Sequence, residues 1–142
     1  MSSTLHKLLM KADRLHRQYL LVKSPKRGGK IQCFITKRYF NSEDLEVAHF
    51  IDRAKECVRF YDLNCHLVVR ASNRHDSGVY SDDLYGGMSK HHFEYKVALI
   101  DAYGQEMLDD LISYEDNCVG LSRQDIREYI IEFKQTIKDG GS

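Results

Sequence analysis

Residues 31–71 constrain this chain most, because they hold three apolar segments that are too short for ordinary helices and are separated by turn residues. The segments are 31–36, 47–51 and 66–71. Runs of this length between turn residues are typical of strands. Ser72 follows the third segment and can cap a helix whose first residue is Asn73. We therefore predict a small strand–strand–helix unit, ββα, within residues 31–78.

Helical periodicity marks the chain before this unit. Apolar residues recur there at spacings of three and four, which predicts a helix of about five turns. The helix should end near Lys23, because Pro25 disfavours helical geometry at Ser24. The apolar stripe comprises Leu5, Leu8, Ala12, Leu15, Tyr19 and Val22, whereas His16 and the basic residues fall mostly off it.

Helices are also predicted after the unit, over 89–103 and 105–114, with Gly104 between them as a natural helix end. Ser122 and Asp125 resemble a capping box that opens a final helix. The expected fold class is α+β, a small ββα hairpin flanked by an N-terminal helix and a C-terminal helical segment.

A chain of 142 residues is long enough for one domain with a core of its own. We assign residues 1–138 to that domain: 1–30 as a basic helix and loop, 31–78 as the ββα core and 88–138 as a helical support. Residues 139–142 are interpreted as a linker. No apolar run approaches the roughly 18–20 residues of a membrane span, and the N-terminus lacks a signal-peptide pattern, so we expect no membrane contact and a cytoplasmic location.

Charge is distributed unevenly although the net charge is zero. Residues 1–40 hold ten Lys or Arg and one acid, whereas the rest holds eleven basic and twenty acidic residues. Such asymmetry indicates a basic face for a polyanion, although a solvated helix with a basic loop would show it too. Residues 26–30 form a flexible basic loop suited to phosphate contacts, but they lack the pattern of a nucleotide-binding P-loop.

The four cysteines are Cys33, Cys57, Cys65 and Cys118, and no two have C-x-x-C spacing. With no secretory signal, we expect free thiols that behave as small, partly buried hydrophobic residues. The adjacent pair His91-His92 points in directions about 100° apart on a helix, so we expect a structural or solvent role for it.

Three polar residues stand at the turns of the predicted unit: His49, Asn64 and Asn73. Phosphodiester hydrolysis requires a base for water, a cation for the developing charge and groups that fix the phosphate. Taken singly, a histidine on a short strand is more often a packing residue, and the asparagines are more often a turn residue and a helix cap. The order of the three is by itself a weak signal for a hydrolytic site, and further residues around them add weight to it.

The residues around these positions resemble the phage NinG/Rap recombination endonucleases, an HNH or ββα-metal family. In that family a G-H-F-x-x-R run is followed by R-F-D-x-x-N, then C-N-R, then a glycine. The resemblance covers about residues 5–137, with an expanded loop at 78–90. The matching segments here are Ala48-His49-Phe50-Ile51-Asp52-Arg53, Arg59-Phe60-Tyr61-Asp62-Leu63-Asn64, Ser72-Asn73-Arg74 and Ser77-Gly78.

This resemblance implies a metal-dependent, structure-selective endonuclease acting on branched or partly single-stranded DNA, in the host cytoplasm if the chain is phage-encoded. His49 would be the general base, Asn64 its orienting residue, and Asn73 with Glu46 the ligands of Mg²⁺ or Mn²⁺. His49, His75 and Asp76 are alternative ligands. A homodimer is expected, since a junction offers two strands to two symmetric sites. The apolar stripe of the first helix could supply its interface, although core packing explains that stripe as well. Phosphate contacts are assigned to Lys26, Arg27, Lys37, Arg38, Arg53 and Arg74.

Two departures from the family pattern shape these expectations. The family's paired C-x-x-C knuckles read Cys33-x-x-Thr36 and Val69-x-x-Ser72 here, so a structural zinc is not expected. The family's acidic residue near the histidine is usually Asp, but here it is Glu46. A catalytically inactive nuclease fold that binds DNA or a protein partner is the alternative, and an RNA-directed nuclease is a further one.

Overall fold

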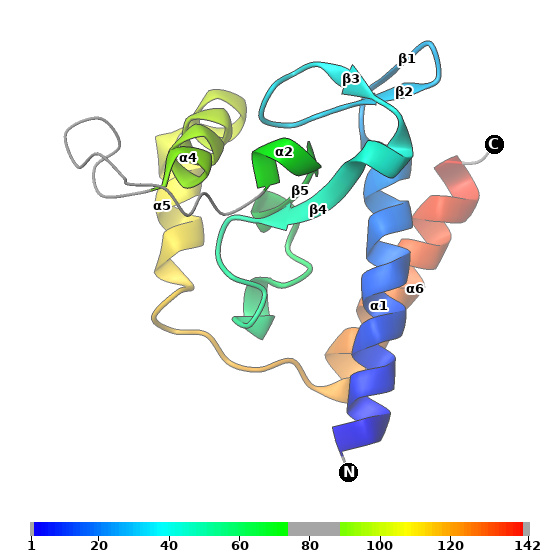
Figure 1. Cartoon of the computed structure of the whole chain (residues 1–142). Coiled ribbons are helices and arrows are strands. Elements are labelled where there is room, and N and C mark those ends of the chain that lie inside the picture. Colours follow the sequence, from blue (N-terminus) through cyan, green and yellow to red (C-terminus); the bar gives the residue numbers. More distant parts are fainter. Residues whose placement is uncertain (1, 74–88, 141–142) are drawn as a thin grey trace.

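The computed structural model describes residues 2–73 and 89–140, and its helices and small antiparallel sheets confirm the α+β class (Figure 1). The helices are α1 (Ser2–Lys23), α2 (Arg70–Asn73), α4 (Lys90–Tyr103), α5 (Gln105–Ser113) and α6 (Arg123–Gly140). The strands are β1 (Lys26–Arg27), β2 (Lys30–Gln32), β3 (Tyr39–Phe40), β4 (Leu45–His49) and β5 (Cys65–Val69). Short 3-10 helices are η1 (Ser42–Asp44), η2 (Glu56–Val58) and η3 (Asp62–Asn64).

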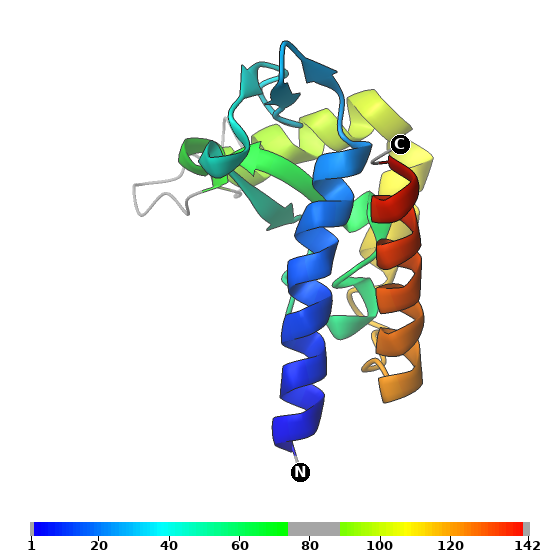
Figure 2. The ribbon, with the colours of Figure 1, turned by 90° about the vertical axis from the view of Figure 1, so that its right-hand side faces the viewer.

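The first and last helices, α1 and α6, lie side by side and run in the same direction, as both views show (Figures 1 and 2). Phe133 of α6 packs against the Tyr19 ring, with centroids 4.7 Å apart, and against the His16 ring at 5.0 Å. The expectation that His16 falls off the apolar stripe was wrong: four residues after Ala12 and three before Tyr19, it faces inward and is 2% exposed. Of the stripe of α1, Ala12 and Tyr19 are buried within the chain, whereas Leu5, Leu8, Leu15 and Val22 are half-buried, and dimerisation stays a prediction.

Local signals set the ends of the C-terminal helices as predicted. Ser89 caps α4 by accepting a hydrogen bond from the His92 backbone N–H (3.1 Å), and Gly104 ends the helix at a φ of 92°. Ser122 and Asp125 form the predicted reciprocal pair at the start of α6, with bonds of 2.9 and 3.0 Å. Within residues 2–73 and 89–140, no helix combines the length and the apolar character that a membrane crossing requires.

Two arginines join the helical layer to the hairpin. Arg17 of α1 donates to the carbonyls of Ser42 and Leu45, at 2.7 Å each. Arg59 holds Asp13 of α1 through two bonds, of 3.1 Å and 2.6 Å. Arg17 belongs to the basic N-terminal region, so part of that region's charge fixes β4 against α1.

The first predicted strand, 31–36, is extended only as far as Gln32, because the chain turns at Cys33. Cys33 N–H donates to the Arg38 carbonyl (2.8 Å), and Lys37, at a φ of 66°, donates back to the Cys33 carbonyl (2.9 Å). The buried Cys33 sulfur accepts the backbone N–H groups of Thr36 and Val69, at 3.5 and 3.4 Å. Hydrogen bonds to this sulfur thus join segments 33–36 and 69–72. These segments match the positions of the C-x-x-C knuckles in the family that the sequence resembles.

The expectation of four free thiols was wrong for one pair. Cys57 of η2 and Cys118, in the segment before α6, form a disulfide across 61 residues, with their Cα atoms 5.5 Å apart. Sequence spacing cannot show such a contact, because only the tertiary fold brings η2 to that segment. Cys33 and Cys65 are free and buried.

Candidate active site around His49

The strands β4 and β5 pair antiparallel, and β5 is followed directly by α2, in the predicted ββα order. Their register runs from Leu45 opposite Val69 to His49 opposite Cys65. Helix α2 begins at Arg70, earlier than the Ser72 cap predicted. His49 therefore ends the first strand of the hairpin, and the long loop 50–64 separates it from its partner Cys65.

The half-buried His49 ring is held by the backbone of that loop. Its Nε2 lies 2.9 Å from the Arg59 carbonyl oxygen, which can only accept, so Nε2 carries the proton and Nδ1 keeps the lone pair. Burial lowers the pKa of His49, although its hydrogen bond to Arg59 acts in the opposite direction. The imidazole is consequently neutral near pH 7 and chemically able to take up a proton.

Asn64 is fully buried, and its side chain stabilises the same loop through hydrogen bonds to the loop backbone. Its side-chain amide donates to the carbonyls of Ile51 and Val58, at 3.0 Å each, and its oxygen accepts the Ile51 N–H at 2.7 Å. Val58 directly precedes Arg59, whose carbonyl holds His49. Asn64 thus fixes the backbone that orients His49, which is the arrangement that its predicted role requires.

A second histidine connects this hairpin to α4. Tyr95 O–H donates toward the carbonyls of Ala48 (3.2 Å) and Asn64 (3.3 Å), so its oxygen accepts from His66 Nδ1–H at 2.7 Å. The remaining nitrogen, Nε2, then accepts the Tyr103 hydroxyl at 2.9 Å. Burial, and secondarily the charge of Lys37, lower the pKa of His66 to about 3, so this chain of bonds contains a neutral imidazole.

His49 lines a cavity of about 540 Å³ between the end of β4 and the start of α4. Arg53 lines it too and is exposed, so the structure brings this predicted phosphate contact to the predicted base. The other lining residues are Val47, Phe50, Ile51, Asp52, Ser89, His91, His92, Tyr95 and Glu115. The cavity thus combines imidazoles with one guanidinium, of Arg53, and two carboxylates, of Asp52 and Glu115, so any contact with a phosphate falls to Arg53.

The structure does not bring Glu46 to this cavity. Successive residues of a strand point to opposite faces, so Glu46 and Ala48 share one face and Val47 and His49 the other. Asn73 lies in α2, but its side chain is outside the described residues, as are Arg74, His75 and Asp76. The assignment of Asn73 and Glu46 as metal ligands stays a prediction.

The remaining predicted phosphate contacts lie on or near the small sheet β1–β2–β3, away from His49. Lys26 donates to the carbonyls of Val22 and Ser24, and Arg27 stacks on Tyr39 with its guanidinium carbon 5.0 Å from the ring centre. Lys37 and Arg38 follow the turn at Cys33, and both are exposed. These cations form a separate patch rather than part of the His49 cavity.

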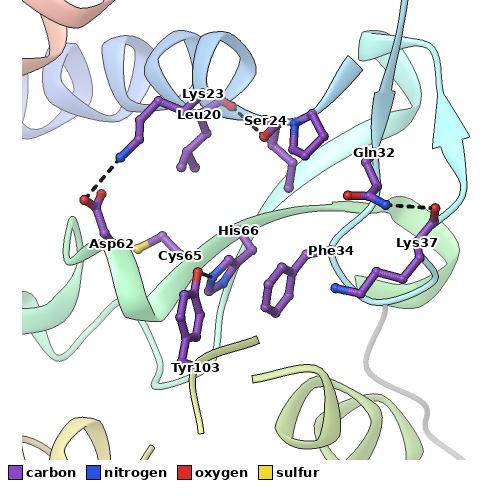
Figure 3. Close-up of a pocket in the computed structure, with 12 residues that line it drawn as sticks. Leu20, Lys23, Ser24, Gln32, Phe34, Lys37, Asp62, Cys65, His66 and Tyr103 are labelled. Atoms are coloured by element: carbon purple, nitrogen blue, oxygen red, sulfur yellow. Dashed lines mark hydrogen bonds and ion pairs between the residues drawn. The ribbon is translucent and has the colours of Figure 1, made fainter. Parts of the chain in front are cut away.

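Lys37 instead lines a second cavity, of about 310 Å³, between α1, β5 and α4 (Figure 3). Its ammonium lies 4.3 Å from the centre of the Phe34 ring, which stacks on His66. Figure 3 also shows Lys23 directed at Asp62, 3.4 Å away, across the cavity from Lys37. The His66 chain of hydrogen bonds therefore links the two cavities, because Tyr95 lines the one with His49, and His66 and Tyr103 line the one with the two lysines.

The donor atoms around His49 fit hard divalent cations poorly. Mg²⁺ and Mn²⁺ prefer oxygen ligands. Among the described residues, the group of three or more histidine, cysteine or acidic side chains close enough to share an ion is His16, His49 and Cys65, which offers nitrogen and sulfur. The described residues thus do not assemble the predicted Mg²⁺ or Mn²⁺ site.

Sequence reasoning missed several residues that the fold brings to His49. His16 and Cys65 approach it from inside, and His91, His92 and Glu115 line its cavity. The spacing of His16 from Ala12 and Tyr19 is the one local signal that indicated an inward-facing histidine. The expectation for His91-His92 rested on the divergence of adjacent side chains on a helix, yet both residues line this one cavity.

Comparisons with protein-family models, with curated proteins and with solved structures found no match.

Proposed function

We propose that this protein is a metal-dependent, structure-selective DNA endonuclease whose active site is the cavity around His49. One observation carries the proposal: the imidazole at the end of β4 is oriented by the Arg59 carbonyl, and buried Asn64 fastens the adjoining backbone. Such support is expected where a side chain must act in one orientation, and ordinary packing does not require it.

The chemistry proposed for His49 is general-base catalysis of hydrolysis. Nδ1 accepts a proton from a water molecule as the water oxygen forms a bond to phosphorus. The bond between phosphorus and the leaving sugar oxygen breaks, that oxygen takes a proton from solvent water, and His49 later returns its own proton to solvent. Arg53, in the same cavity, would pair with the phosphate and balance the charge that develops on it.

Duplex DNA would extend from the cavity toward the small sheet. Leu45 and His49 mark the two ends of β4, and the small sheet lies next to the Leu45 end along the chain. At about 3.3 Å per residue, β4 spans about 13 Å, roughly four base steps along a duplex axis. A bound duplex can thus reach both Arg53 and the cations of the small sheet, which supports their predicted role in phosphate binding.

A non-catalytic DNA-binding protein is the second candidate. The observation that favours it is the position of Glu46 on the strand face opposite His49, with no oxygen-rich ion site among the described residues. Under this alternative the basic patch and Arg53 still bind DNA, but no bond is cleaved.

The deciding experiment is cleavage of a labelled panel of single strand, duplex, D-loop and four-way junction, in Mg²⁺ and in Mn²⁺, with a chelator control. His49→Gln should reduce cleavage by about 100-fold or more, because it removes the base. His6→Gln is the matched control, since His6 is exposed on α1 far along the chain from the site, and it should leave cleavage unchanged.

Binding to the same panel is measured at two salt concentrations. Metal-dependent cutting that His49→Gln abolishes supports the endonuclease. Salt-sensitive binding without cutting in either ion refutes it and favours the second candidate.

A further inference from the structure

A compact cluster of metal-binding side chains joins His49 to two residues that do not line its cavity, the buried His16 and Cys65. One ring nitrogen of His16, one ring nitrogen of His49 and the Cys65 sulfur all lie within 4.8 Å of one another. They come from three elements: His16 from the middle of α1, and His49 and Cys65 from facing positions of β4 and β5. The strand register and the packing of α1 thus fix all three donors.

The His16 ring has an unsatisfied polar atom at this cluster. Its Nε2, the ring nitrogen farther from the helix backbone, is buried and finds no hydrogen-bond partner among the described residues. The rest of the ring is packed by aromatic side chains, with Phe60 at 5.3 Å and Phe133 at 5.0 Å between centroids. Leaving a buried polar atom unsatisfied destabilises the fold, and an apolar side chain at position 16 would avoid that cost.

The Cys65 thiol provides a softer donor beside the same backbone. Its S–H donates to the Arg59 carbonyl at 3.1 Å, the same oxygen that accepts from His49 Nε2 at 2.9 Å. Binding of a metal ion would replace the thiol proton, which leaves to solvent as the thiolate forms. Cys65 is the free cysteine that lies near histidines, whereas Cys33 is engaged by backbone N–H groups elsewhere.

We propose that His16, His49 and Cys65 form a site for Zn²⁺, with the fourth coordination position left to water or a ligand. Two imidazoles and a thiolate suit a borderline or soft ion and disfavour Mg²⁺. Zinc–nitrogen and zinc–sulfur bonds of about 2.0–2.3 Å place tetrahedral donors about 3.3–3.6 Å apart. Each pair of donors therefore has to approach by at most about 1.5 Å, which side-chain rotation and small backbone shifts can supply.

Zinc at this site would remove the base of the proposed enzyme, a consequence that rests on the proposed function. A neutral imidazole has one nitrogen with a free lone pair and one that bears hydrogen. Whichever nitrogen of His49 binds the ion, the other bears the hydrogen, so no lone pair remains for water. The binding site itself does not depend on nuclease activity.

Metal binding is tested with Co²⁺, which absorbs visibly where zinc does not. The metal-free protein is titrated in oxygen-free buffer without a thiol reductant, so that the Cys57–Cys118 disulfide stays closed and Cys33 and Cys65 are the only free thiols. One equivalent of Co²⁺ should produce thiolate-to-cobalt charge-transfer absorption, and Zn²⁺ should displace it. Zinc should also raise the thermal midpoint of the wild-type protein.

The variants are chosen in matched pairs. Cys65→Ser should abolish the charge-transfer band, whereas Cys33→Ser, at the other free buried cysteine, should keep it. His16→Gln should weaken Co²⁺ binding on the order of 100-fold, since even residues that only support a ligand contribute 10–100-fold. His6→Gln should not weaken it.

Absence of the band in the wild type refutes the site, as does a band that persists in Cys65→Ser or unchanged affinity in His16→Gln. If Cys65→Ser does not fold, His16→Gln with the wild-type zinc shift decides the question. Cleavage assays play no part in these readouts, so the metal site and the endonuclease can fail separately. Where cleavage is observed, added Zn²⁺ should suppress it in the wild type, whereas His16→Gln should resist this inhibition.

Discussion

Replacing Asn64 by alanine is the sharpest test of how the hairpin loop is held. The substitution removes three buried hydrogen bonds, leaving one N–H of Ile51 and the carbonyls of Ile51 and Val58 without their side-chain partner. An unsatisfied buried group costs about 1–3 kcal/mol, and carbonyls, with two lone pairs, fall toward the lower end. The sum is about 4 kcal/mol, a large fraction of the roughly 5–15 kcal/mol that stabilises a typical domain.

The measurement is the free energy of unfolding in urea, followed by far-UV circular dichroism. Asn117→Ala is the matched control, because Asn117 is exposed and its side chain makes one long contact of 3.5 Å; it should change stability by less than about 0.5 kcal/mol. A loss below about 1 kcal/mol for Asn64→Ala, at an unchanged urea slope, would refute the reasoning.

Hydrogen exchange in the wild type gives an independent measurement if Asn64→Ala cannot be recovered folded. The Ile51 amide donates to Asn64 at 2.7 Å, so it should exchange only through large openings of the structure. Rapid exchange at Ile51 would mean that the loop is not fastened as described.

Three further predictions concern the contacts around the site. The two-bonded Asp13–Arg59 pair should show a coupling of about 1 kcal/mol in a double-mutant cycle with Asp13→Asn and Arg59→Gln, and additive single effects would contradict it. The buried environment lowers the pKa of His66 from 6.5 to about 3, so the unfolded chain binds more protons between these values and stability should fall as pH drops below 6.5. From about pH 7 to about pH 4.5 the loss due to His66 should be about 3 kcal/mol; urea unfolding of His66→Gln should show a correspondingly weaker pH dependence, and equal dependence would contradict the assignment. Opening the Cys57–Cys118 disulfide, by reduction or with Cys57→Ser and Cys118→Ser, should cost about 4 kcal/mol on the loop-entropy estimate; an unchanged melting temperature would show that the link adds no stability.

The helices were predictable because their signals are local. Capping residues and glycine act within one turn, so Ser122 with Asp125 and Gly104 marked helix ends without knowledge of the tertiary fold. The existence of the hairpin was predictable, but its strand boundaries were not: β4 begins at Leu45 rather than Val47. That shift matters, because it brings Glu46 into the strand, where its side chain lies on the face opposite to that of His49.

The contacts that complete the site depend on packing between distant segments. His16 reaches His49 because α1 lies against the hairpin, and Cys65 does so because the register pairs it with His49. The disulfide joins segments on either side of α4 and α5. Residue type and spacing in one sequence carry no record of such juxtapositions, so these residues could be identified only once the fold was known.

The pairing of the first helix with the last has a consequence for biosynthesis. On the ribosome, α1 emerges long before α6, so the face that carries His16 and Tyr19 stays uncovered until Phe133 of α6 has been synthesised. Contacts between segments so far apart in sequence slow folding and leave apolar surface exposed in the meantime. The nascent chain should therefore need a chaperone, or an early temporary partner for α1, more than its modest length would indicate.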